Sequence, residues 1–190
     1  MKSVILDSGH GGIIDGVYQT AGKRSPAWPD GTILYEGEFN RAVKARIIER
    51  LSSINVPYID ISPELIDISL NERVQRANKY AKNSFLVSIH ANAGGGTGSE
   101  VFISPKASET SKKIAQEAAR RYERIFTGYK WRGIKQKEFT IIHKTKMPAV
   151  LFECFFMDNK KECNQILQTR VGRDHCADWI YSTIIESLFF

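Results

Sequence analysis

Hydrophobic and polar positions along the chain follow two alternating patterns. Short apolar runs rich in Val, Ile and Phe are typical of strands, and longer segments whose apolar residues recur every three or four positions are typical of helices. The predicted strands are 4–6, 57–59, 85–90, 99–103, 139–142 and 149–152, and the predicted helices are 36–51, 69–81, 108–126, 161–167 and 173–188. This alternation predicts one α/β domain over residues 1–190, with a twisted, mostly parallel sheet of about six strands and helices on both faces.

The connection 13–35 stands out because it is long and contains several glycines and prolines. Loops of this length in a compact domain are usually functional or disordered, and its aromatic residues Tyr18, Trp28 and Tyr35 argue against disorder. Two interpretations remain: the connection lines a substrate groove, or it packs over an edge of the sheet.

Composition places the chain among ordinary soluble proteins, with 42% hydrophobic and 25% charged residues. No window approaches the roughly 20 apolar residues of a membrane span, and the N-terminus lacks the pattern of a signal peptide. We therefore expect synthesis in the cytoplasm and no membrane insertion. The three cysteines show no metal-binding spacing, so we expect buried free thiols, with Cys154 in the core.

The net charge of +6 favours an anionic partner. No nucleic-acid-binding motif is present, so nucleic acid is not the expected partner. The predicted helix 108–126 is rich in Lys and Arg between residues 112 and 124, and we expect this basic surface to contact anionic polymers.

Chemistry-bearing residues stand where three predicted strands end. His10 follows the first strand, His90 ends the strand 85–90, and Glu153 ends the strand 149–152. In sheets of this kind, ligands bind outside the carboxyl ends of the strands. Two histidines with a nearby carboxylate are typical ligands of a catalytic zinc ion.

Two carboxylates at the start of the helix 36–51 are candidates for the third ligand. Glu36 lies three residues before Phe39 and seven before Val43, so it continues the apolar face of the helix. Glu38 lies on a more solvated flank and suits a first-turn acid that faces the helix dipole. Helical phase therefore favours Glu36.

Glu153 is the fourth candidate, since it ends an otherwise apolar run. Burial of a carboxylate there is costly unless it is paired or faces a cleft, where it can act as general base and acid. A helix cap or a surface salt bridge is the structural alternative. The same pattern places His143 at the end of the strand 139–142 near this edge, where it either contacts substrate or lies on the strand surface. His175 receives no role.

Several motifs together resemble the zinc-dependent N-acetylmuramoyl-L-alanine amidases, a family of bacterial cell-wall amidases and phage endolysins. The resemblance runs nearly the whole length and is carried by ILDSGHGG, YEGEFN, LNERVQRAN, VSIHANA, GSEVF and PAVLFECFF. It implies that His10, Glu36 and His90 bind one Zn²⁺ ion and that Glu153 is the catalytic glutamate. Ser8 stands where proline is common, which changes the rigidity of the turn but not the ligand.

The resemblance further implies a peptidoglycan hydrolase that cuts the amide between the lactyl group of N-acetylmuramic acid and L-alanine. We expect a monomeric phage or prophage endolysin, or a bacterial autolysin, without a separate wall-binding domain. Two alternatives remain open: a zinc metallopeptidase that cuts within the stem peptide, and a non-catalytic wall-binding protein.

Overall fold

A computed structural model describes residues 2–190 and places six strands in one sheet. Their order across the sheet is β4-β1-β5-β8-β6-β7. Pairing is parallel among β4, β1, β5 and β8 and between β6 and β7, whereas β6 runs antiparallel to β8. The bounds are β1 Ser3–Ser8, β4 Tyr58–Asp60, β5 Ser84–Asn92, β6 Ser99–Ile103, β7 Trp131–Gln136 and β8 Ala149–Phe156.

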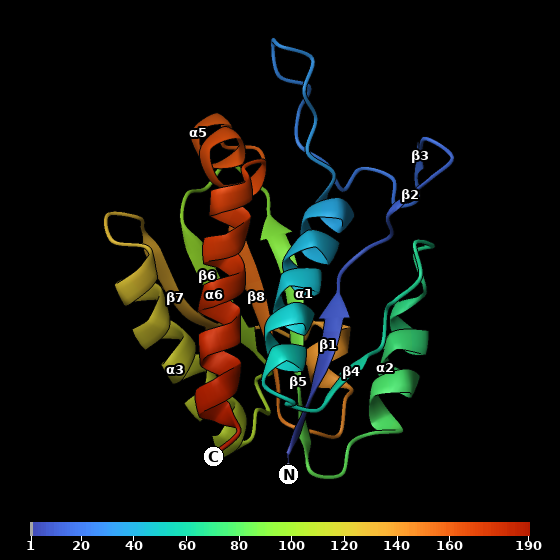
Figure 1. Ribbon diagram of the computed structural model, residues 1–190, viewed down its shortest axis with the longest axis vertical. Helices are drawn as coiled ribbons and strands as arrows, with labels where there is room; N and C mark the ends of the chain where they lie inside the picture. Colours follow the sequence, from blue (N-terminus) through green and yellow to red (C-terminus); the bar gives the residue numbers. More distant parts are fainter. Residues whose placement is uncertain (1) are drawn as a thin grey trace.

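Helices cover both faces of this sheet, as predicted (Figure 1). The larger core lies under the long helices, and the smaller core lies under the two shorter ones on the opposite face. The long helices are α1 Glu36–Ser53, α3 Glu109–Ile125 and α6 Arg170–Ser187, and the short ones are α2 Leu70–Asn78 and α4 Thr140–His143. Between β8 and α6 the chain forms α5 Lys160–Glu162 and the π-helix η1 Cys163–Leu167.

The predicted strand 139–142 is wrong. Residues Thr140–His143 form the helical turn α4, in which the backbone N–H groups of Ile142 and His143 donate to the carbonyl of Phe139. A short apolar run does not distinguish a buried helical turn from a strand, and here the turn buries Ile141 and Ile142 in the smaller core. His143 therefore ends a helical turn and not a strand.

The sixth strand is instead β7, at the edge of the sheet next to β6. Its side chains are mostly half-exposed and include Arg132 and Lys135, so its sequence lacks the apolar run that marks the central strands. Charged residues on an edge strand are common because they discourage pairing with another chain.

The connection 13–35 contains a small antiparallel hairpin, β2 Ile13–Ile14 and β3 Val17–Tyr18, and a bridge between Arg24 and Tyr35. The indole N–H of Trp28 donates to the Cys163 thiol, and the ring packs against the larger core. This aromatic residue therefore serves packing.

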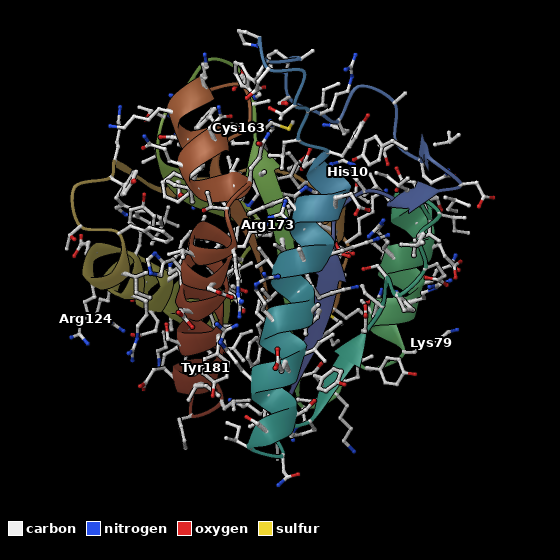
Figure 2. The ribbon with its side chains drawn as sticks, turned by 45° about the horizontal axis from the view of Figure 1, so that its top comes forward. His10, Lys79, Arg124, Cys163, Arg173 and Tyr181 are labelled. Atoms are coloured by element: carbon white, nitrogen blue, oxygen red, sulfur yellow. The ribbon has the colours of Figure 1, made fainter. Side chains whose placement is uncertain are left out.

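All three cysteines are free and buried, as expected, and Cys154 is fully enclosed. Among residues 2–190, no helix is long and apolar enough to cross a membrane. Figure 2 shows His10 at the end of the molecule where α1 begins, with Arg124 directed outwards from α3.

Candidate metal centre and catalytic site

His10 follows β1 in a turn with an unusual backbone. Its φ of 68° lies in the left-handed region, which an L-residue adopts at a cost in conformational energy. The preceding Gly9 permits close packing, because a Cβ atom there would stand 2.0 Å from Cε1 of His90. The turn thus brings the two imidazole rings together at an edge-to-face angle of 88° and a centroid distance of 5.1 Å.

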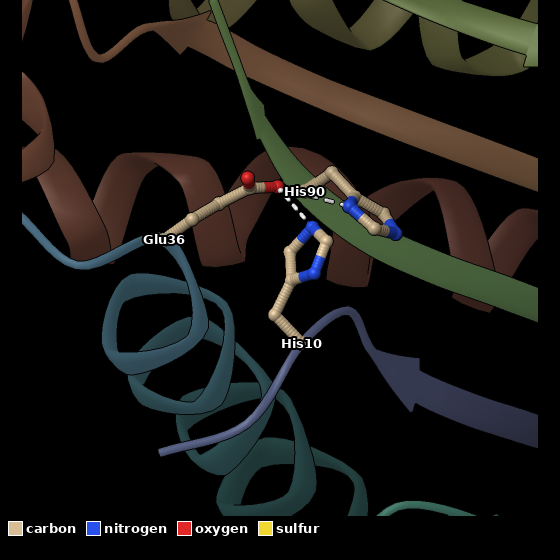
Figure 3. A group of neighbouring side chains, drawn as sticks. All are labelled: His10, Glu36 and His90. Atoms are coloured by element: carbon tan, nitrogen blue, oxygen red, sulfur yellow. Dashed lines mark hydrogen bonds and ion pairs between the residues drawn. The ribbon is translucent and has the colours of Figure 1, made fainter. Parts of the chain in front are cut away.

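Glu36, the first residue of α1, joins the two histidines (Figure 3). Its Oε1 atom lies 3.2 Å from Nε2 of His10 and 3.0 Å from Nδ1 of His90. The carboxylate side chain is 4% exposed, whereas the histidine side chains are 17% and 15% exposed and face the cavity described below. Burial opposes ionisation, but the two histidine contacts lower the pKa of Glu36 to about 2.

The start of α1 is held in place by its backbone. The N–H of Glu36 donates to the Lys23 carbonyl, and the N–H of Gly37 donates to the Tyr18 hydroxyl. A Cβ at Gly37 would stand 1.7 Å from the carbonyl oxygen of Gly11, so only glycine lets the helix approach the His10 turn this closely. These contacts direct the Glu36 side chain towards the histidines.

Glu153 lies beside His90 because β5 and β8 pair in register at these two residues. The antiparallel neighbour β6 places Glu100 opposite Glu153, so the three side chains form a row across the sheet. Burial raises the pKa of Glu153 to about 8. Its Oε2 atom is buried and has no hydrogen-bond partner among residues 2–190.

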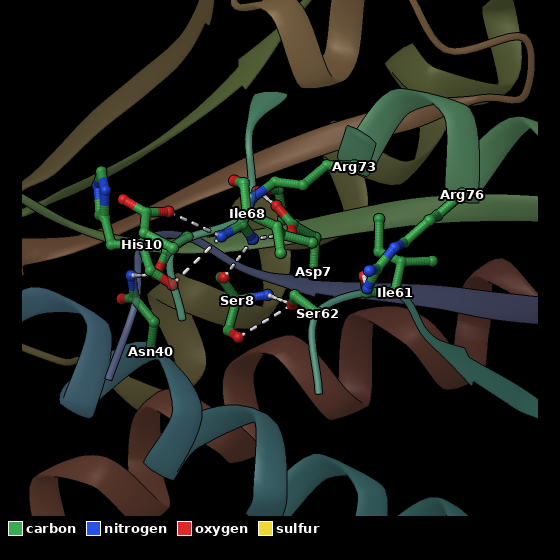
Figure 4. Close-up of polar contacts among 12 residues, drawn as sticks. Asp7, Ser8, His10, Asn40, Ile61, Ser62, Ile68, Arg73 and Arg76 are labelled. Atoms are coloured by element: carbon green, nitrogen blue, oxygen red, sulfur yellow. Dashed lines mark hydrogen bonds and ion pairs between the residues drawn. The ribbon is translucent and has the colours of Figure 1, made fainter. Parts of the chain in front are cut away.

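Arg73 of α2 reaches over the end of β1 and bonds to the turn that carries His10 (Figure 4). Its guanidinium donates to Asp7 Oδ1 at 2.5 Å, to the Ser8 carbonyl at 2.7 Å and to the His10 carbonyl at 3.2 Å. The remaining N–H groups donate to Asp67 Oδ1 and to the Ile68 carbonyl, each at 3.2 Å. All five N–H groups of the guanidinium are therefore bonded.

Asp7 and Asp67 extend this bracing. Burial would raise the pKa of Asp7, but the Arg73 charge and the Ser88 hydroxyl bond outweigh it and lower the pKa. Asp67 also accepts from the Thr20 hydroxyl, which in turn accepts from the N–H of Gly11. The His10 turn is thus held on one side by the buried Arg73–Asp7 pair and on the other by the exposed Thr20–Asp67 bond.

A cavity of about 470 Å³ opens over these residues and is lined by His10, Glu36, His90 and Glu153. A second hollow of about 300 Å³ adjoins it, since both are lined by His10, Lys23, Leu70, His90 and Ile141. The three residues expected at strand ends and Glu36 from the start of α1 therefore meet at one cleft.

His10, Glu36 and His90 form the one group of three or more such side chains within residues 2–190 that can hold a metal ion, with their ligand atoms within 4.8 Å of one another. Glu38 is not among them. Two imidazole nitrogens and a carboxylate oxygen suit Zn²⁺, and a cation there would neutralise the buried Glu36 charge that the histidines now share. The residues present thus fit this ion.

Some site-related residues differ from expectation. His143 lines a different cavity, where its Nδ1 lies 2.9 Å from the Ser104 hydroxyl. Sequence patterns gave no role to Arg73, although a charged residue on the buried side of a helix is a detectable signal. Lys23 and Lys137 also line the main cavity and were not identified as site residues.

Fold and site together define an α/β domain with a candidate hydrolytic metal centre at the carboxyl ends of its parallel strands. Residues 4–186 match the family model of N-acetylmuramoyl-L-alanine amidases, and the chain belongs to this family. The resemblance drawn from the sequence motifs is thereby confirmed.

Relatives and solved structures agree with this assignment. The endolysin of Bacillus phage SPP1 is 31% identical over 173 residues, which are 85% of this chain and 57% of the endolysin. The amidase CwlM of Bacillus licheniformis is 29% identical over 169 residues, 87% of this chain and 61% of CwlM. The catalytic domain of the amidase CwlV from Bacillus (Paenibacillus) polymyxa var. colistinus has a TM-score of 0.81 at 28% identity, with 100% of this chain and 99% of that domain covered. The chain spans less than two thirds of either curated relative.

Proposed function

We propose that this protein is a zinc-dependent N-acetylmuramoyl-L-alanine amidase that hydrolyses the amide between the lactyl group of N-acetylmuramic acid and L-alanine. The observation that carries the proposal is the juxtaposition of Glu153 with His90, in register on neighbouring strands, above the carboxylate that both histidines share. Membership of the amidase family supports this choice of substrate bond.

His10, Glu36 and His90 would hold the zinc ion, which when bound acts as a Lewis acid and lowers the pKa of water from 15.7 towards about 7. A cation at the metal centre would favour the ionised form of Glu153, whose pKa burial raises in the metal-free protein. The Glu153 carboxylate then takes a proton from the attacking water and returns it to the nitrogen of the leaving L-alanine. The buried Oε2 atom of Glu153 holds this proton away from bulk water. Arg73 holds the His10 turn, and Lys23 holds the start of α1, so the ligand set is preorganised.

The role of Glu153 is tested with the zinc-loaded Glu153→Gln variant on purified cell walls. We expect loss of wall clearing with unchanged zinc content, because Glu153 is not a ligand. Glu138→Gln is the matched control, since Glu138 is a glutamate with a 67% exposed side chain in the segment after β7. Wall clearing by Glu153→Gln at the wild-type rate would remove Glu153 from the mechanism.

The metal requirement is tested by chelation followed by restoration of zinc. We expect wall lysis to stop after chelation and to recover with Zn²⁺ but not with Mg²⁺, which prefers oxygen ligands. Lysis that persists in a protein shown by elemental analysis to be metal-free would contradict the proposal.

Two other functions remain to be separated from this one. A metallopeptidase acting on the stem peptide would use the same metal ligands, whereas a non-catalytic wall binder would have no use for a buried carboxyl at the cavity. Mass spectrometry of digested peptidoglycan distinguishes them: the amidase releases intact stem peptides and peptide-free glycan, a metallopeptidase releases shortened peptides, and a binder releases neither.

The cellular setting is the bacterial wall, and the endolysin and amidase relatives support a role as endolysin or autolysin. We also propose that the basic surface of α3 contacts anionic wall polymers. Several of its cations are already paired, since Arg120 and Arg121 contact Glu117. Wall binding that does not weaken between low and high salt would refute this contact.

A further inference from the structure

Two lysines line the cavity that holds the candidate metal centre. Lys23 lies in the connection before α1, and Lys137 follows β7 at the other side of the cavity. Lys23 also lines the adjoining smaller hollow. A molecule bound across the cleft would therefore contact lysines from two segments far apart in the sequence.

Both lysines have a fixed backbone. The carbonyl of Lys23 accepts the N–H of Glu36 at 2.9 Å, so the residue is bonded directly to a metal-ligand residue, and the Arg24–Tyr35 bridge closes the loop next to it. The N–H of Lys137 donates to the Ile103 carbonyl at 3.1 Å, and its Nζ stands 4.6 Å from the ring centroid of Phe139, another residue of the cavity wall.

Neither ammonium group has a carboxylate partner within ion-pair distance in the described part of the chain. The neighbouring cations differ in this respect, because Arg132 and Lys135 both contact Glu100. The carboxylates lining the two hollows are also occupied: Glu36 contacts both histidines, and Asp7 and Asp67 contact Arg73. Glu153 is half-buried and is not an ion-pair partner of either lysine.

The two ammonium groups at the cleft therefore have no ion-pair partner among residues 2–190, and a cation bound at the metal centre would add positive charge beside them. A ligand with an anionic group is favoured at such a site. If the proposed function holds, the substrate has two parts next to the cut bond. The N-acetylated glycan is uncharged, whereas the stem peptide is acidic. The anionic group thus belongs to the peptide.

Resting on the proposed function, we propose that Lys23 and Lys137 are specificity-determining residues that bind the free carboxylate of the acidic residue directly after L-alanine in the stem peptide. Lys23 lines the same cavity as Glu36, and its charge acts on Glu153, so a carboxylate bound to it lies close to the cut bond. One extended residue spans only about 3.5 Å, which makes the residue next to L-alanine the nearest acidic one. The enzyme then prefers walls in which this carboxylate is free over walls in which it is a carboxamide.

The experiment compares two synthetic substrates that differ in this one group: N-acetylmuramoyl-L-alanyl-D-glutamate and the corresponding D-isoglutamine compound. We expect the zinc-loaded wild type to have a kcat/KM about tenfold higher for the carboxylate, mostly through KM, as befits a hydrogen bond between charged groups. Lys23→Met and Lys137→Met should each reduce the ratio, and the double variant should bring it to about one. Lys23→Glu should reverse the preference.

Lys82→Met is the matched control, because it removes the same charge from an exposed position before β5 and should leave the ratio of the two kcat/KM values unchanged. Binding provides a second readout. Calorimetry with Glu153→Gln should show the same tenfold difference in Kd between the two compounds, and this difference should disappear when Lys23→Met and Lys137→Met are added.

Equal rates of wild-type cleavage for both substrates would overturn the lysine assignment and leave the amidase function standing. A wild-type ratio of the two kcat/KM values in both lysine variants would also overturn the lysine assignment and leave the amidase function standing. Cleavage of neither substrate by the zinc-loaded protein would overturn the amidase function and the lysine assignment with it.

Discussion

Arg73 donates a hydrogen bond from Nη2 to the backbone carbonyl of His10 across 3.2 Å. The donor is on α2, the acceptor is the residue that carries a candidate zinc ligand, and the guanidinium has no free N–H group left. The Arg73 side chain is 3% exposed, so these bonds form away from water. They hold a histidine with a left-handed backbone, which would otherwise relax to a more common conformation.

We predict that Arg73→Lys weakens zinc binding by about 10- to 100-fold, the usual cost of losing a residue that positions a metal ligand. Lysine keeps the charge near Asp7 but cannot reach all five acceptors. We also expect the free energy of unfolding to fall by about 2 kcal/mol, because buried acceptors lose their partners. Competition with a chromogenic chelator measures the zinc affinity.

Arg76→Lys is the control for this change. Arg76 lies one turn further along α2 and forms partly exposed ion pairs with Glu64 and Glu72. Such pairs contribute at most about 1 kcal/mol, so zinc affinity should stay at the wild-type value. Equal zinc affinities for the two variants would show that Arg73 supports the fold but does not position His10.

The choice of Glu36 over Glu38 is tested by a pair of variants. Glu36→Gln should reduce bound zinc to well below one ion per chain, because the shared oxygen loses its charge. Glu38→Gln should bind zinc as the wild type does, since Glu38 lies outside the ligand group. Elemental analysis after dialysis measures both, and retention of zinc by Glu36→Gln would refute its assignment as a ligand.

Gly9→Ala should disturb the site by a steric route. The new methyl group would fall 2.0 Å from the His90 ring, so the ring must move away from its position beside Glu36. We expect zinc affinity to fall by at least about tenfold. Gly128→Ala is the comparison, because Gly128 also meets a conformational cost at a φ of 84° but has open space around it. The free energy of unfolding of Gly128→Ala should fall by about 1 kcal/mol, and its zinc affinity should stay at the wild-type value.

The buried carboxyl of Glu153 predicts how the stability of the metal-free protein depends on pH. Its pKa of about 8 in the folded protein exceeds the ordinary value of 4.5, so folding favours the protonated form. This contribution to stability is complete below about pH 4.5 and is lost as the pH rises through 8. Between pH 5 and pH 8, the free energy of unfolding of the wild type should fall by about 3 kcal/mol more than that of Glu153→Gln.

Urea unfolding of the chelated proteins at several pH values measures this difference. The Glu153→Gln variant controls for all other titrating groups, including His90, whose pKa is raised because the Glu36 contact outweighs the effect of burial. Parallel pH profiles for the two proteins would show that Glu153 is as well solvated in the folded chain as in the unfolded one.

Local pattern predicted much of this protein because its central strands and long helices are strongly periodic. The apolar runs of β1, β5 and β8 and the apolar face of α1 are visible without tertiary information. Strand ends in a parallel sheet meet at one edge, and this rule alone brought His10, His90 and Glu153 together. The 3.6-residue period of the helix likewise distinguished Glu36, on the apolar face of α1, from Glu38, on its solvated flank.

The edge strand β7 and the helical turn α4 could not be assigned in this way. Residues of β7 are mostly half-exposed and include two charged ones, so their pairing with β6 is set by backbone hydrogen bonds and not by an apolar pattern. Ile141 and Ile142 would be apolar in a strand or in a helical turn, so their residue type does not distinguish the two. Packing against the smaller core stabilises the helical turn.

The sequence by itself determined the layered α/β fold, the histidine and glutamate residues at the strand ends and the family resemblance, since these depend on local periodicity and residue type. Only the tertiary structure decided which polar groups support them. Three features join segments that lie far apart in the chain: the bonding of Arg73 to the His10 turn, the row of His90, Glu153 and Glu100, and the two cavity lysines, which have no ion-pair partner within residues 2–190. Contacts of this kind depend on strand order and register, and no pattern within one segment records them.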